Sequence, residues 1–309
     1  MMRIKRFKQL FENSEKLTQE QITWLDECTQ ENWTLNEETG EVDIKGDFNC
    51  QGQDLSDFKG VRFGYVTGSF NCSFNELTSL EGAPYRVNSY FDCKKNRLTS
   101  LEGLPEGFQV GGFSCRHNWI TTLKGAPQEV FLNFDCAGND LRSLEYAPQK
   151  VQSFNCHGNE LTSLKGAPQS MSGNFTCFSN RLTSLEGAPK KVGGEFDCFN
   201  NKLTSLKGAP QEIGWDFNCS DNDISSLEGA PPSIGGDIDS GGNAISEEIM
   251  EFVLSKIGKE GASLGQAVSK CWESMSEEDR IYLAKDNPDL SPEERRGYEA
   301  LSRYKTRVI

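Results

Sequence analysis

The residues best suited to chemistry in this sequence are its cysteines and histidines. The 309-residue chain holds eleven cysteines and only two histidines, His117 and His157. Thiolates and imidazoles can bind zinc or serve as nucleophile and base. A metal site needs converging ligands, such as a CxxC pair or nearby histidines, and the spacing provides neither. Nine cysteines instead recur every 20 to 22 residues, at positions 50, 72, 93, 115, 136, 156, 177, 198 and 219.

Other arrangements that could carry chemistry are equally weak. His157 follows Cys156 directly, but the pattern predicts that Cys156 points into the core, which disfavours a Cys–His nucleophile. The run from Asp237 through Asp239 to Asn243 resembles a calcium loop without its acidic fifth position and closing glutamate. No phosphate-binding glycine motif is present. We therefore expect this protein to have no catalytic residue, no metal and no cofactor.

The element that positions these residues is a short strand, seen in residues 192–213, VGGEFDCFNNKLTSLKGAPQEI. Phe196 and Cys198 alternate with polar residues, which predicts a strand with both apolar side chains on one face. Asn201 and Leu203 follow where the chain turns. The Gly-Ala-Pro segment suits a turn-rich extended return, because proline lacks an amide donor.

The same positions recur along the chain and predict a solenoid. A single repeat cannot bury its apolar edge, so stacking must join the Phe, Cys and Leu columns into one core. The asparagine amides are expected to bond to backbone groups of their own and neighbouring turns. The Phe column is Phe48, Phe70, Phe91, Phe113, Phe134, Phe154, Phe175, Phe196 and Phe217, closed by Ile238. The Asn column is Asn75, Asn96, Asn118, Asn139, Asn159, Asn180, Asn201, Asn222 and Asn243.

These columns resemble a leucine-rich repeat, with Phe and Cys at the second and third leucine positions and Asn and Leu matching directly. The segments LTSLEGAP and LTSLKGAP resemble the short bacterial subtype, and the run as a whole resembles repeat proteins of bacteriophage genomes. The resemblance covers about residues 46 to 245. It implies a right-handed α/β repeat solenoid, predominantly β, with about ten short parallel strands and helical caps.

Three regions are expected along the chain. Residues 1–46 form an N-terminal cap, with a capping box at Thr18 and Gln21 and a hairpin that leads into the first strand. Residues 47–245 form the solenoid. Residues 246–309 carry four helical patterns and form either a cap or a second contact surface.

Composition and charge limit the classes of partner. No signal peptide and no apolar run of membrane-spanning length is recognised, so we expect a soluble cytoplasmic protein with reduced thiols. The net charge of −14 disfavours nonspecific nucleic-acid binding, which depends on basic surface. It permits basic protein partners, or mimicry of nucleic acid. Small molecules and membranes are not expected as partners.

The outward residues of the concave strand face are the candidate binding residues. Lys94, Lys95, Arg116 and His117 lie on adjacent repeats and are expected to form a basic spot. Phe178 and Phe199 are expected to stack, exposed beside it, as a hot spot for a partner. Further candidates are His157 in the same column and the acidic residues of the late repeats, Asp197, Asp216 and Asp239, which are joined by Glu195 and Asp237.

Alternatives stay open for each of these features. The two phenylalanines could be covered by the C-terminal helices, and the basic spot could be solvated surface. The leading hypothesis is a non-enzymatic binding module, in its most specific form a phage protein that binds or inhibits a host defence protein.

Three rival functions remain. An acidic nucleic-acid mimic would depend on the aspartates and not on the phenylalanines. A ubiquitin-ligase-like effector would depend on Cys271, the one cysteine of the tail. A structural or assembly component would self-associate.

Overall fold

The structure is a computed structural model, which describes residues 17–30, 32–225 and 229–243. The chain divides into two compact units, Met1–Asn139 (unit 1) and Asp140–Ile309 (unit 2). The predicted C-terminal helical region, 246–309, lies outside the described residues, and so does Cys271. Its boundary, like the boundary predicted at residue 46, stays a prediction.

Unit 1 begins with a helix and a hairpin. Helix α2 (Gln19–Thr29) starts at the predicted capping box, in which the Thr18 hydroxyl accepts from the Gln21 amide and the Gln21 side chain accepts from the Thr18 amide. Strands β1 (Trp33–Asn36) and β2 (Glu41–Ile44) pair antiparallel. The Trp24 ring of α2 packs edge-on against Phe48, with ring centroids 5.5 Å apart. The helix thereby shields the first ring of the core from water.

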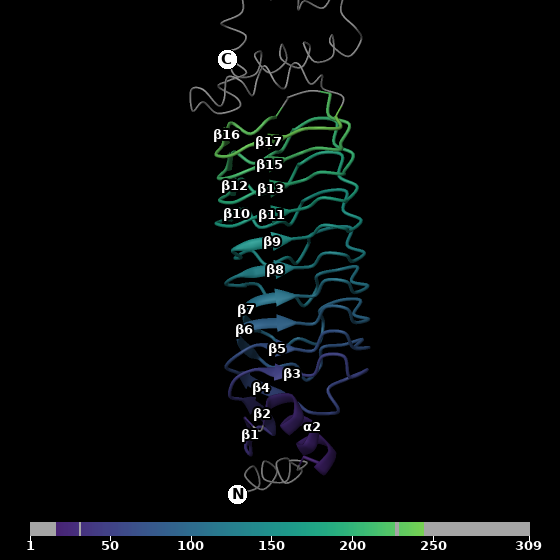
Figure 1. Cartoon of the computed structure of the whole chain (residues 1–309), viewed down its shortest axis with the longest axis vertical. Helices are drawn as coiled ribbons and strands as arrows, with labels where there is room; N and C mark the ends of the chain where they lie inside the picture. Colours follow the sequence, from purple (N-terminus) through teal and green to yellow (C-terminus); the bar gives the residue numbers. More distant parts are fainter. Residues whose placement is uncertain (1–16, 31, 226–228, 244–309) are drawn as a thin grey trace, which may run out of the picture. The chain divides into compact units, whose positions relative to one another are not determined.

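Five stacked turns follow in unit 1, each contributing one strand to a parallel ladder (Figure 1). Pairing is in register, so that Phe48 lies beside Phe70 and Phe91 beside Phe113. A second parallel ladder pairs β2 with β4 and β4 with β6. Its residues precede the Phe position in each turn. The strands are β3 (Phe48–Asn49), β4 (Phe63–Val66), β5 (Phe70–Asn71), β6 (Arg86–Asp92), β7 (Gln109–Ser114) and β8 (Asn133–Asp135).

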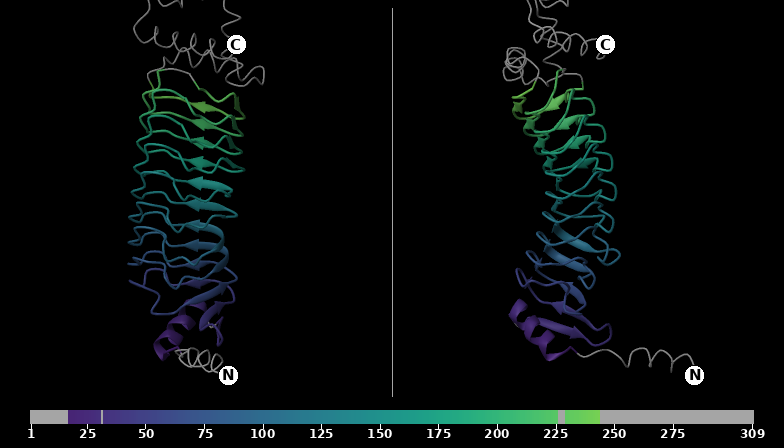
Figure 2. Two further views of the ribbon diagram at one scale, coloured as in Figure 1. Left: turned by 180° about the vertical axis from the view of Figure 1, so that it is seen from behind. Right: turned by 90° about the vertical axis from the view of Figure 1, so that its right-hand side faces the viewer.

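Unit 2 repeats this arrangement with shorter strands (Figure 2). One parallel ladder carries the Phe column, with Phe175 beside Phe154 and Phe196 beside Phe217. A second parallel ladder lies earlier in each turn. The first consists of β9 (Ser153–Asn155), β11 (Phe175–Thr176), β13 (Phe196–Asp197), β15 (Phe217–Asn218) and β17 (Ile238–Asp239); the second of β10 (Ser170–Met171), β12 (Lys191–Val192), β14 (Glu212–Ile213) and β16 (Ser233–Ile234).

The core consists of the predicted columns. Phenylalanine rings of successive turns stack at 5.2 Å between Phe70 and Phe91 and at 5.5 Å between Phe175 and Phe196. The nine column cysteines from Cys50 to Cys219 are buried, and they form no disulfide bonds with one another. The predicted solenoid of short parallel strands is confirmed, with ten strands at the Phe position among the described residues.

The asparagine column forms hydrogen bonds to backbone groups in the turn after each strand. The Asn180 amide donates to the carbonyls of Cys156 and Cys177 at 3.1 and 3.0 Å, and its oxygen accepts from the Leu161 amide at 3.0 Å. Each asparagine thus joins two turns and satisfies buried backbone groups, which are costly to leave unpaired.

Two local features were not predicted. The second ladder of unit 2 uses Met171, Val192, Ile213 and Ile234, four residues before the Phe position, where the sequence predicted only a return path. The residue two after each column cysteine takes a left-handed backbone conformation, with φ of 52° at Lys95 and similar values in the other turns. The tight bend between strand and asparagine requires this conformation.

Candidate functional site

The side chains that alternate with the buried Phe and Cys residues point away from the core. We call this surface the ladder face. It has three columns: the residue before each Phe position, the residue between Phe and Cys, and the residue after Cys. All ten predicted site residues lie in these columns except Lys95 and His117, which occupy the left-handed turn position that follows.

The middle column has a structural role as well as a charge. The Asp197 carboxylate accepts a hydrogen bond from the Phe199 amide at 3.5 Å, and Asp239 accepts from the Gly241 amide at 3.0 Å. In the turn between them Asn218 does the same for Ser220 at 3.1 Å. Asp or Asn is favoured here because either side chain can close this two-residue turn.

The predicted basic spot is present in unit 1, but its charge is largely balanced. Lys94 pairs with Asp92 at 2.7 Å, and Arg116 lies 3.8 Å from Asp135. Both acids belong to the middle column of the same face. The predicted basic spot therefore carries less net positive charge than its basic residues alone would give.

The other two basic residues pack on their neighbours. The Lys95 ammonium lies 4.7 Å from the ring centre of Phe74. His117 has a lowered pKa because of partial burial and the nearby charges of Arg116 and Lys95. The His117 ring is therefore neutral at pH 7 and adds no charge to the spot.

In unit 2 three rings stack across three successive turns. The His157 and Phe178 ring centres are 4.2 Å apart with 8° between planes, and Phe178 and Phe199 are 4.4 Å apart with 18° between planes. The stacking of the phenylalanines is as predicted. Their predicted exposure is wrong, since both are half-buried. Flat stacking covers both faces of the Phe178 ring and one face of the Phe199 ring.

An acidic hollow of about 280 Å³ lies on the ladder face of the last three turns of unit 2. It brings together the predicted acidic residues, and none of its carboxylates forms an ion pair within the described residues. Burial raises the pKa of Asp197 to about 6, with further contributions from the negative charges of Glu195 and Asp239. The carboxylates that line the hollow are Glu195, Asp197, Asp216, Asp237 and Asp239.

The buried thiols are poorly suited to nucleophilic chemistry. Cys156 is buried, as predicted, and burial raises the pKa of Cys177 and Cys198 well above the usual thiol range. In the part of the chain that the structure covers, no three metal-ligating side chains converge. The same residues contain no helix with the length and apolar character needed to cross a bilayer.

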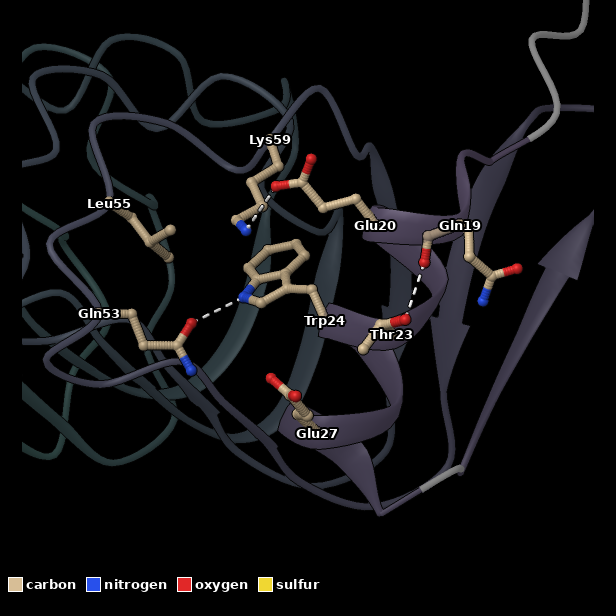
Figure 3. A pocket seen from close by; sticks show the side chains of 8 residues that line it. All are labelled: Gln19, Glu20, Thr23, Trp24, Glu27, Gln53, Leu55 and Lys59. Atoms are coloured by element: carbon tan, nitrogen blue, oxygen red, sulfur yellow. Dashed lines mark hydrogen bonds and ion pairs between the residues drawn. The ribbon is translucent and has the colours of Figure 1, made fainter.

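A second depression lies beside α2 in unit 1 (Figure 3). Its polar groups already bond to one another: the Trp24 indole donates to the Gln53 side chain at 2.7 Å, and Lys59 pairs with Glu20 at 3.2 Å. These contacts fasten the helix to the first turn. The depression is therefore part of the cap contact, and the ladder face of unit 2 remains the better candidate site.

Among the described residues, six exposed aromatic side chains were not predicted, and three of them stand out by their surroundings. Phe74 carries the two lysines of the basic spot, and Trp215 is 62% exposed immediately before Asp216. Tyr146, with φ of 68°, stands where six other turns have a glycine before Ala-Pro. The signal was available, because each large residue interrupts a column of small or polar ones.

Comparison with solved structures supports the fold. The chain is similar to YopM from Yersinia enterocolitica WA-314, a leucine-rich-repeat protein, with a TM-score of 0.50 and 19% sequence identity. The likeness covers 77% of this chain but only 54% of YopM, so this chain spans about half of that protein. No protein-family model matches the sequence, and no curated protein matches it. The structure is thus a solenoid of the leucine-rich-repeat type.

Proposed function

We propose that this protein is a non-enzymatic binding module that holds a protein partner on the ladder face of unit 2. The observation that carries the proposal is the combination of a half-buried ring stack with five carboxylates that lack an ion-pair partner among the described residues. Aromatic side chains serve as anchors in protein interfaces, and surface charge without an internal partner attracts a protein of opposite charge.

The energetics favour a partner over bare solvent. Carboxylates held together on one surface repel one another, and the raised pKa of Asp197 reflects part of that cost. A cationic partner would relieve this repulsion and also cover the apolar edges of Phe178 and Phe199. The same residues would then supply both the steering of the partner and its short-range affinity.

The resemblance to repeats of bacteriophage proteins supports a more specific form of the proposal. In this form the partner is a host protein in the cytoplasm, and binding inhibits it. Mass spectrometry of the proteins captured from a bacterial lysate tests this form of the proposal. A captured partner whose gene lies next to the gene of this protein would contradict it.

The direct test is capture of a partner by the tagged full chain and by the double variant Phe178→Ala, Phe199→Ala. Small residues occupy the same column at Ser73, Ala137 and Ser220, so the fold accommodates them. Loss of the partner in the double variant supports the proposal. The control is Phe131→Ala, which removes an aromatic side chain of unit 1 that is 71% exposed. Retention of the partner by the double variant would place binding elsewhere.

A second candidate, mimicry of nucleic acid, is favoured by the acidic hollow alone. Asparagine replaces aspartate at neighbouring positions of the same columns, at Asn174 and Asn218. The fourfold variant Asp197→Asn, Asp216→Asn, Asp237→Asn, Asp239→Asn therefore removes charge and keeps the turn acceptors. A mimic would lose its target in this variant and keep it in the phenylalanine variant.

A further inference from the structure

The stack of rings on the ladder face stops at Phe199. In the next turn the equivalent position is Ser220, whose hydroxyl donates to the Asn218 side chain at 2.7 Å. Phe178 covers one face of the Phe199 ring. Within residues 17–30, 32–225 and 229–243, no ring covers the opposite face, which is directed toward the Ser220 turn. One more planar group could extend the stack there.

The place above Ser220 lies between two carboxylates. Ser220 belongs to the turn of Asn218, which is neutral, and the turns on either side carry Asp197 and Asp239 in the same column. Neighbouring strands are about 4.8 Å apart, so a cation at the Ser220 level has an acid one turn away on each side. Neither acid has an ion-pair partner among the described residues, and both line the acidic hollow.

We infer that this position receives an arginine side chain of a basic protein partner, with its guanidinium stacked on Phe199 between Asp197 and Asp239. This inference rests on the proposed function and names the chemistry of the partner. The guanidinium is planar and weakly hydrated, stacks on aromatic faces and donates to carboxylates in a fork. It therefore satisfies both the open ring face and the flanking acids.

Other occupants fit less well. A lysine ammonium can pair with the acids, but it is compact and strongly hydrated and gains less from the ring. A nucleobase could stack, but its phosphates would meet five carboxylates. A metal ion would need three converging ligands, and the described residues hold no such group.

The test uses two peptides of equal length and charge, one alternating arginine with glycine and the other alternating lysine with glycine. Binding to the full-length chain is measured by isothermal titration calorimetry. We expect the arginine peptide to bind about two- to fivefold more tightly, the range for an exposed cation–π contact. Equal affinities for the two peptides would overturn the inference.

Phe199→Leu separates stacking from charge, because leucine keeps apolar bulk and removes the ring. We expect this variant to weaken the arginine peptide to the level of the lysine peptide and to leave the lysine peptide unchanged. The matched control Phe131→Leu in unit 1 should change neither affinity, and the fourfold asparagine variant should weaken both peptides. Unchanged arginine binding by Phe199→Leu would contradict the inference, as would binding of a single-stranded oligonucleotide at this face. Thermal unfolding of each variant establishes that it is folded.

The failure of this inference is distinguishable from failure of the proposed function. Suppose that the captured partner is lost in the double phenylalanine variant while the two peptides bind equally. That result would support the proposed binding module and contradict the inference that an arginine binds beside Phe199. If the partner is retained by that variant, the proposed function itself falls.

Discussion

The two units have cores built from the same residue columns, and they differ on the ladder face. In unit 1 the acids of the middle column are balanced, Asp92 by Lys94 and Asp135 by Arg116. In unit 2 the equivalent column carries Asp197 and Asp239, which form no ion pair within the described residues. The backbone turn is the same in both. The difference therefore comes from the residue after each cysteine, which is basic in two turns of unit 1 and aromatic or small in the late turns of unit 2.

This contrast shows that the charge of the ladder face can change while the turn that supports it stays the same. The turn needs only a short oxygen acceptor in the middle column, so either Asp or Asn is tolerated there. Charge on the ladder face can then vary from turn to turn at little structural cost. In unit 1 the charges of Asp92 and Asp135 are balanced by nearby cations, whereas in unit 2 the carboxylates of the acidic hollow form no ion pair among the described residues.

The largest expected effect tests whether the cores are equivalent. Asn118→Leu in unit 1 and Asn180→Leu in unit 2 each remove hydrogen bonds to two cysteine carbonyls and to one leucine amide. We expect each variant to lower the free energy of unfolding by about 3 kcal/mol, because buried backbone groups lose their partners. Urea unfolding followed by circular dichroism measures both. A loss confined to one unit would mean that the cores are not equivalent.

A smaller effect is expected at the glycine that precedes Ala-Pro. Gly125→Ala in unit 1 should destabilise by at least about 1 kcal/mol, since φ is +89° and an added Cβ would lie 2.4 Å from the Leu101 carbonyl oxygen. At the same position of unit 2, Tyr146→Gly should stabilise by up to about 1 kcal/mol, because it removes a left-handed tyrosine.

Thermal unfolding of both variants checks these signs. Destabilisation by Tyr146→Gly would show that the exposed ring contributes contacts that outweigh its backbone strain.

The smallest stability effects should have opposite signs in the two units. Asp92→Asn breaks the pair with Lys94 and should cost about 0.5–1 kcal/mol. Asp197→Asn removes a partly buried charge that has like-charged neighbours, and should stabilise at pH 7 by less than about 1 kcal/mol because water screens the site. Chemical denaturation at pH 7 compares them, and a loss of stability in both would remove the contrast between the faces.

The pH dependence of Asp197 follows from its raised pKa. The folded value of about 6 exceeds the ordinary value of 3.8, so the folded state holds this proton more tightly than the unfolded state. Its contribution to stability is present below pH 4 and is lost as the pH rises to about 6. We expect the advantage of Asp197→Asn over wild type to grow between pH 4 and 7 and then level off. An advantage independent of pH would contradict this account.

Much of the fold was predictable because equivalent residues of successive repeats stack on one another, so that sequence spacing gives their positions directly. Nine Phe and nine Cys positions of fixed spacing predicted parallel strands with a buried spine, and the asparagine column predicted the bonds between turns. The second ladder of unit 2 was missed because its apolar column is only one residue wide and is followed by Gly-Gly in two of the four turns, after Val192 and Ile234, which suggests a loop.

The candidate site was predictable only in part. Column position placed Phe178 beside Phe199 and gathered Asp197, Asp216 and Asp239 on one surface. Their exposure and net charge were not predictable, because these depend on side-chain rotamers and on the residues of the adjacent turns.

By itself the sequence determined the period, the strands and the residues that share each face, because parallel stacking in register copies sequence spacing directly into space. The tertiary structure alone decided which charges cancel and which rings cover one another. Lys94 reaches Asp92 within its own turn, whereas the late turns of unit 2 offer no comparable cation among the described residues. Such outcomes depend on distances of a few ångströms between side chains, since Coulomb and stacking energies fall steeply with separation.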